Sequence, residues 1–128
     1  MPAPPSLDEI RNSRDRALAA LGVAVTGIGD EIAATTQTGP YLDQLTKRYQ
    51  DLMNERSAIR AAATDAVLAL PSVLQAAATL NSLSSQMKKT AQALPKATHV
   101  LTTATAVLSL GQQFADAIAN VSRGLGSH

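Results

Sequence analysis

The sequence has no cysteine, no tryptophan and few aromatic residues of any kind: two tyrosines and one phenylalanine in 128 residues. Without cysteine the chain forms no disulfide and offers zinc no thiolate ligand. With so few aromatics, a core must be assembled from leucine, valine, isoleucine, methionine and much alanine, and alanine buries little area at about 25 cal/mol per Å². A lone monomer of this size and composition has a small margin of stability, so the composition favours association.

Histidine is almost as scarce, with His99 and His128 as its two occurrences. A di-metal helical bundle needs Glu-x-x-His pairs, and neither histidine follows an acidic residue at that spacing. A nucleophile, a base and an orienting group cannot be assembled from the remaining side chains either. The sequence therefore predicts a protein that is not an enzyme and that holds no metal or cofactor.

Charge is balanced overall and unevenly placed. The net charge of +1 gives no reason to expect a nucleic acid partner. Residues 1–65 carry nine acidic and seven basic side chains, whereas residues 66–128 carry one acidic and four basic. Apart from His99, the stretches 66–87 and 97–115 have no charged or titratable side chain. These stretches must be covered by the rest of the chain, by further copies or by lipid.

Apolar residues recur at spacings of three and four along most of the chain, which predicts amphipathic helices. We expect an all-α fold, an antiparallel bundle of three to four long helices at about 6–35, 40–70, 72–94 and 96–123. Pro71 predicts a kink or a tight turn. Residues 6–123 are expected to form one domain, between a flexible proline-rich lead at 1–5 and a flexible tail at 124–128.

Three glycines interrupt the first predicted helix: Gly22, Gly27 and Gly29. Each costs about 1 kcal/mol of helix stability relative to alanine. They indicate either close packing against a neighbouring helix or a bend, or else a break near residues 27–29 that gives a hinge. No strand-like segment precedes them and the phosphate-binding loop pattern is missing, so they do not indicate a nucleotide site.

The apolar stripes of the later helices define an interaction seam, the set of residues expected to contact a neighbouring helix or a partner. Its members are Leu42, Leu45, Tyr49, Leu52, Ile59, Val73, Leu80, Met87, Val100, Val107, Phe114 and Ile118. A basic cluster, Lys88, Lys89 and Lys96, lies between the third and fourth helices. It is expected to be a solvated turn, with contact to an anionic surface as the alternative.

Two functions follow from the charge-poor stretches. The first is a helical interaction or assembly protein that forms homo-oligomers or docks a helical partner through faces in residues 66–121. The second is a membrane-active hairpin with a lysine-rich tip, because residues 66–87 would span about 33 Å as one helix. Glutamine, asparagine and serine within that stretch, and the lack of an interfacial aromatic belt, favour the first.

The first residues do not form the apolar core of a signal peptide, because charged side chains begin at Asp8 and Glu9. Cytoplasmic synthesis is therefore the default expectation, and export by a signal-less route remains open to the chain.

Overall fold

The computed structural model describes residues 7–94 and 99–126, and every regular element within these ranges is a helix. In chain order the described helices are α1 (Leu7–Ala34), α2 (Pro40–Ala62), α3 (Asp65–Leu68), α4 (Pro71–Gln75), α5 (Ala77–Gln92) and α6 (Val100–Gly126). They pack against one another, which confirms the predicted all-α class.

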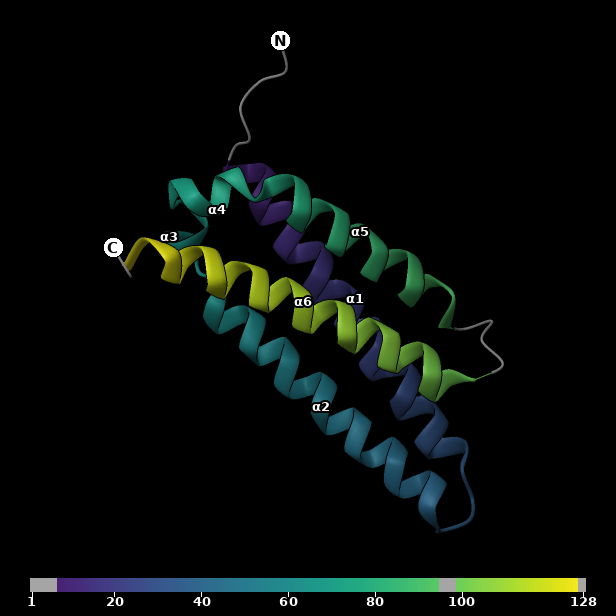
Figure 1. The fold of residues 1–128 in the computed structure, drawn as a ribbon. Coiled ribbons are helices and arrows are strands. Elements are labelled where there is room, and N and C mark those ends of the chain that lie inside the picture. The colour runs from purple at the N-terminus through teal and green to yellow at the C-terminus, as the bar shows by residue number, and fades with distance from the viewer. Residues whose placement is uncertain (1–6, 95–98, 127–128) are drawn as a thin grey trace.

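The four long helices lie side by side, and Figure 1 shows successive long helices running in opposite directions. Helix α1 is the central element, because it packs against α2, α5 and α6 and also against the short α3. Helices α3 and α4 lie together at the end of the molecule where α2 stops and α5 starts (Figure 1).

Helix α1 passes without interruption through its three glycines. A Cβ atom added at Gly27 would lie 3.3 Å from Leu94 Cδ2, and one at Gly29 would lie 3.6 Å from Tyr49 Cε2. The missing side chain at Gly27 therefore lets Leu94, which follows α5, approach α1 closely, and Gly29 faces the middle of α2 at ordinary contact distance. The close-packing interpretation is confirmed and the hinge interpretation is wrong.

The turn between α1 and α2 has the position that the sequence predicts. Gly39 has a φ angle of +149°, a conformation that side-chain-bearing residues rarely adopt. Pro40 is the first residue of α2, where its fixed φ suits a helix start and its missing N–H is not needed.

The predicted helix over 40–70 is wrong at its far end, because α2 stops at Ala62. Ala63 leaves the helical region at φ −104° and ψ 48°, and a new helix begins at Asp65. Thr64 caps that helix, and its Oγ1 accepts a hydrogen bond from the Val67 N–H at 3.4 Å. An N-cap threonine followed by an acidic residue in the first turn outweighs the helix propensity of the alanines before it.

The predicted single helix over 72–94 is also divided. Leu70 is extended, with ψ 136°, and Pro71 is the first residue of α4. The chain leaves the helix again at Ala76, after which α5 runs to Gln92. A break before Pro71 therefore replaces the kinked helix, since the ring of proline disfavours a helical residue before it. The uncharged stretch 66–87 is not one continuous rod.

The last helix is α6, which starts at Val100 and extends to Gly126, three residues beyond the predicted end. The expected flexible tail at 124–128 is thus helical over 124–126. The predicted start of this helix at residue 96, the proline-rich lead at 1–5 and residues 127–128 lie outside the described residues.

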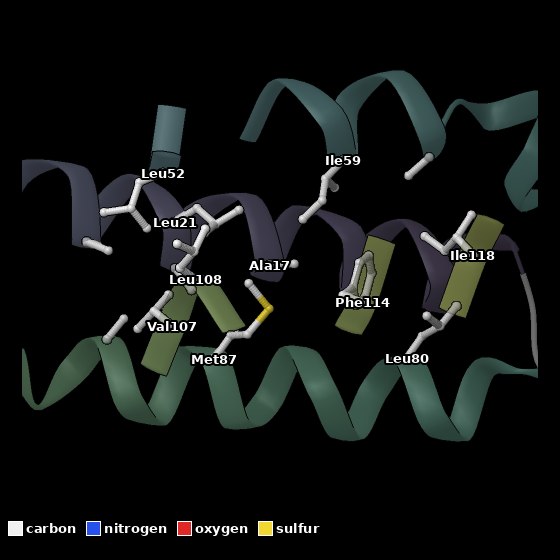
Figure 2. Packing of buried hydrophobic residues seen from close by; sticks show 14 of the residues in the cluster. Ala17, Leu21, Leu52, Ile59, Leu80, Met87, Val107, Leu108, Phe114 and Ile118 are labelled. Carbon is white, nitrogen blue, oxygen red and sulfur yellow. The ribbon is translucent and has the colours of Figure 1, made fainter. Parts of the chain in front are cut away.

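The core is formed by apolar side chains from all six helices. Figure 2 shows side chains of α1, α2, α5 and α6 pointing toward one another, among them Phe114, Ile59 and Leu80, all with no exposed surface. Alanines of α1 and α5, such as Ala17 and Ala77, are also buried in this core.

Candidate docking groove

The predicted interaction seam lies mostly inside the chain. Three of its residues, Leu42, Tyr49 and Val100, are half-buried. The other nine are fully buried: Leu45, Leu52, Ile59, Val73, Leu80, Met87, Val107, Phe114 and Ile118. The fold therefore covers these nine residues with its own helices, and their contact with a partner would require the bundle to open.

The predicted basic cluster is placed in part. Lys88 and Lys89 are exposed in the last two turns of α5, and neither forms an ion pair with another described residue. Lys96 lies outside the described residues. Lys88 lies beside Arg16 of α1, where both side chains border a hollow between the two helices.

Polar side chains join α1 to α5 next to that hollow. The Ser13 hydroxyl donates a hydrogen bond to Asn81 Oδ1. Arg16 Nη1 donates to Ser84 Oγ at 3.0 Å, and the Ser84 hydroxyl donates to the Asn81 carbonyl at 3.1 Å. Ser13 and Ser84 have no exposed surface, so these bonds satisfy buried groups and hold the guanidinium of Arg16 at the rim.

A second polar contact joins α1 to α3. Arg14 Nη1 lies 2.9 Å from Asp65 Oδ1, and Arg11 Nη2 lies 3.1 Å from Asp65 Oδ2. The hydrogen bonds from Arg14 and then Arg11 hold the pKa of Asp65 below its ordinary value. Because the Asp65 side chain is 58% exposed, these ion pairs fix the position of α3 more than they stabilise the fold.

The outer side of α1 carries an open groove made of two adjoining hollows. The larger, about 820 Å³, covers the α1 surface from Ala19 to Ala34 and is also bordered by Arg56, Leu94 and Val100. The smaller, about 360 Å³, lies between α1 and α5. Both hollows are bordered by Ala19 and Val23. We call this surface the α1 groove.

The floor of the α1 groove is formed by small and mostly apolar residues of α1, charged residues border it toward both ends, and the Arg56 guanidinium of α2 borders its middle next to Gly22. Ala19, Gly22, Val23 and Thr26 form the middle, and Val23 is 44% exposed, one of three large exposed hydrophobic side chains in the described residues. Arg16 and Lys88 border one end. Asp30 and Glu31 border the other end.

Helix α1 is correspondingly apolar. Among the described residues it alone is long and apolar enough to cross a membrane, with a mean hydropathy of 1.5 over its best 18 residues, a third of which are buried. Central helices of water-soluble bundles meet the same criterion. The result reflects the missing charges on both faces of α1 between Arg16 and Asp30.

A half-buried carboxyl group lies between α2 and α6. Glu55 of α2 packs near Gly111 of α6. Burial and then the nearby charge of Asp116 raise the pKa of Glu55. Its Oε1 atom is buried and has no hydrogen-bond partner among the described residues. This acid is a cost to stability at neutral pH.

No group of three or more histidine, aspartate or glutamate side chains gathers into a metal-binding arrangement within residues 7–94 and 99–126. The absence of an enzymatic site stays a prediction.

The sequence reasoning missed the outer face of α1 as a site. It predicts an amphipathic first helix without separating its outer face, and it leaves the three glycines between close packing and a hinge. The available signal was the uncharged run at 17–29, which is shorter than the stretches at 66–87 and 97–115.

Comparisons of this chain with protein-family models, with curated proteins and with solved structures find no match. The function is therefore argued from the geometry alone.

Proposed function

We propose that this chain is a non-enzymatic interaction protein, in which the four long helices act as an antiparallel bundle that docks a helical protein partner, either another copy or a different chain. The α1 groove is the docking site, and the charge-poor outer surface within residues 66–121 borders it. The observation that carries the proposal is an open groove with an apolar floor, an exposed Val23 at its centre and charged residues at both ends.

The shape and chemistry of the groove suit a helix. Small side chains in the middle permit helix axes to approach to about 8 Å, the lower end of the usual range. An apolar middle with charged ends matches the way an amphipathic helix binds in a groove, with its apolar face down and its polar residues at the rim. Exposed and neutral side chains continue along the neighbouring α4 and α5, including Gln75, Thr79, Ser82 and Ser85.

A photoreactive amino acid at position 23 tests the proposal inside cells that express the chain. Met53 of α2 is the matched control, because its side chain is 40% exposed and lies outside the α1 groove. We expect irradiation to give a discrete crosslinked protein from position 23 and none from position 53, with the crosslinked residue in a helix when the product is mapped by mass spectrometry.

Two results contradict this function. The first is the same set of products from both positions, which would mean random encounter. The second is crosslinking from position 23 to lipid alone, which would favour the membrane-active alternative. Purified protein mixed with anionic vesicles provides the parallel measurement, and we expect it to float with vesicles no more than a water-soluble control protein does.

A further inference from the structure

The charges at the two ends of the α1 groove have opposite sign and are symmetrically placed about its centre. Arg16 and Asp30 each lie seven residues from Val23 in the same helix, or about 10 Å at a rise of 1.5 Å per residue. Lys88 adds a second positive charge beside Arg16, and Glu31 adds a second negative charge beside Asp30. These four charges would therefore face charges of opposite sign on a second, antiparallel copy, while the Arg56 guanidinium next to Gly22 adds a positive charge near the centre of the groove.

These charges are available for contact. Within the described part of the chain, Arg16, Lys88 and Asp30 form no ion pair. Arg16 uses Nη1 to bond Ser84, which leaves its other N–H groups free to donate. Glu31 accepts a hydrogen bond from the Tyr41 hydroxyl through one oxygen, at 3.0 Å, and keeps the other.

We propose that the occupant of the α1 groove is the α1 helix of a second copy, packed antiparallel about a two-fold axis at Val23. This inference rests on the proposed function and specifies the partner. In that arrangement each Arg16 is level with the partner's Asp30, and each Val23 meets the partner's Val23. Ala19, Gly22 and Thr26 lie between, where short side chains allow the helices to approach, and Arg56 of each copy borders this region next to Gly22.

The charges select this orientation over the parallel one. A parallel pair would place Arg16 beside the partner's Arg16 and Asp30 beside the partner's Asp30, and like charges in contact are unfavourable. The antiparallel pair makes each attractive contact twice, because both copies use the same surface. The interface is thus closed after two copies and does not extend into a filament.

Charge reversal tests the pairing. Arg16→Glu and Asp30→Arg should each weaken self-association of the purified full chain by roughly tenfold or more, as measured by sedimentation velocity over a range of concentrations. An equimolar mixture of the two variants should associate again, because each new charge then meets its opposite. The double variant should associate by itself for the same reason.

The fold of each variant is checked by circular dichroism and thermal melting. Asp30 is exposed and unpaired among the described residues, so Asp30→Arg should keep the melting behaviour of the native chain. Arg16→Glu loses the bond to Ser84, and Lys88→Glu is the replacement variant at the same end of the groove if Arg16→Glu melts early. Lys88 is exposed and takes no part in the Ser13, Asn81 and Ser84 contacts.

Disulfide crosslinking tests the position of the interface directly. Because the chain has no cysteine, a single introduced cysteine can react only with the same residue of another copy. Oxidation of Val23→Cys should yield a disulfide-linked dimer at concentrations where Met53→Cys stays monomeric. A native chain that remains monomeric at millimolar concentration, an unchanged affinity in both charge variants, or a mixture that fails to recover association would each overturn the self-pairing. If the native chain is monomeric while position 23 crosslinks a different protein in cells, the self-pairing fails and the proposed function stands.

Discussion

The two faces of α1 have similar amino-acid compositions, but one face is buried and the other is exposed. The inner face presents Ala17, Leu21 and Ala24, which have no exposed surface. The outer face presents Ala19, Val23 and Thr26, which are exposed. Neither face is charged between Arg16 and Asp30, yet the bundle covers the inner one alone. A lack of charge along a helix therefore marks surface that tolerates contact, and the fold decides which part of that surface is left for a partner.

The interaction seam of the later helices shows the converse: residues with the spacing of an interface are mostly buried by the chain itself. Its residues have the 3-4 spacing expected of an interface, and the chain uses most of them to bury its own core. The substitutions below are ordered from fully buried to exposed positions. Together they test how much the effect on stability differs between buried and exposed surfaces.

The largest effect is expected at the fully buried end of this order. Leu80→Asp places a carboxylate among buried side chains with no partner, at a cost comparable to the whole stability of a small domain. We expect loss of the helical circular dichroism signal at 25 °C. Gln86→Asp, on the exposed side of the same helix, should keep that signal. A folded Leu80→Asp variant that merely dissociates would show that this residue belongs to an interface between chains.

A buried polar contact comes next. Ser84→Ala removes the hydroxyl that accepts from Arg16, and should lower the free energy of unfolding by about 1–2 kcal/mol, measured with urea. Ser85→Ala changes the neighbouring exposed hydroxyl and should stay within about 0.5 kcal/mol of the native chain. Equal effects of the two substitutions would mean that the contact between α1 and α5 adds nothing to stability.

The half-buried Glu55 should show a smaller effect of opposite sign. Glu55→Gln removes a charge that burial and Asp116 disfavour, so the free energy of unfolding at pH 7 should rise by about 0.5–1 kcal/mol. Because the folded-state pKa of Glu55 is raised, the native chain regains this stability as the pH falls from neutral through that pKa. The gap between variant and native chain should therefore narrow toward pH 4.5, and a constant gap would contradict the assignment.

The exposed ion pairs of α3 should matter least. The pKa of Asp65 is lowered by Arg14 and Arg11, so its contribution is present above the ordinary value of 3.8 and is lost as the pH falls through the folded-state value. Asp65→Asn should lower the melting temperature slightly at pH 7 and not at all in strong acid. Asp43→Asn, at an exposed acid in the first turn of α2, is the control, and an equally large effect there would remove any special role for the Asp65 pairs.

The sequence predicts the helical class well because spacing reports which side of a helix is apolar. It also places the start of α2, since Gly39 and Pro40 are strong local signals. It fails between residues 62 and 77, where the helix cap at Thr64 and the break before Pro71 compete with alanine-rich segments of high helix propensity. Local propensity there favours a continuous helix and a broken one about equally. In the broken arrangement, α3 packs against α1 and α4 packs against α6.

The candidate site was harder to predict than the core for a physical reason. Spacing identifies an apolar stripe, but it does not reveal how much of a helix's circumference its neighbours will cover. The residues Ala19, Val23 and Thr26 have the small, neutral character of a packed surface, and their exposure depends on where α2 and α5 stop. That depends on contacts between residues far apart in the chain.

The bonds between Ser13 and Asn81 and between Arg16 and Ser84 also set the order of events in biosynthesis. Each joins residues 68 positions apart, a long separation for a helical protein, in which neighbouring helices usually supply most contacts. The side of α1 that packs against α5 therefore stays uncovered during synthesis until α5 has emerged, although α2 can pack against α1 earlier. Nascent chains truncated before residue 77 should be the ones that chaperones retain, and release should coincide with the emergence of α5.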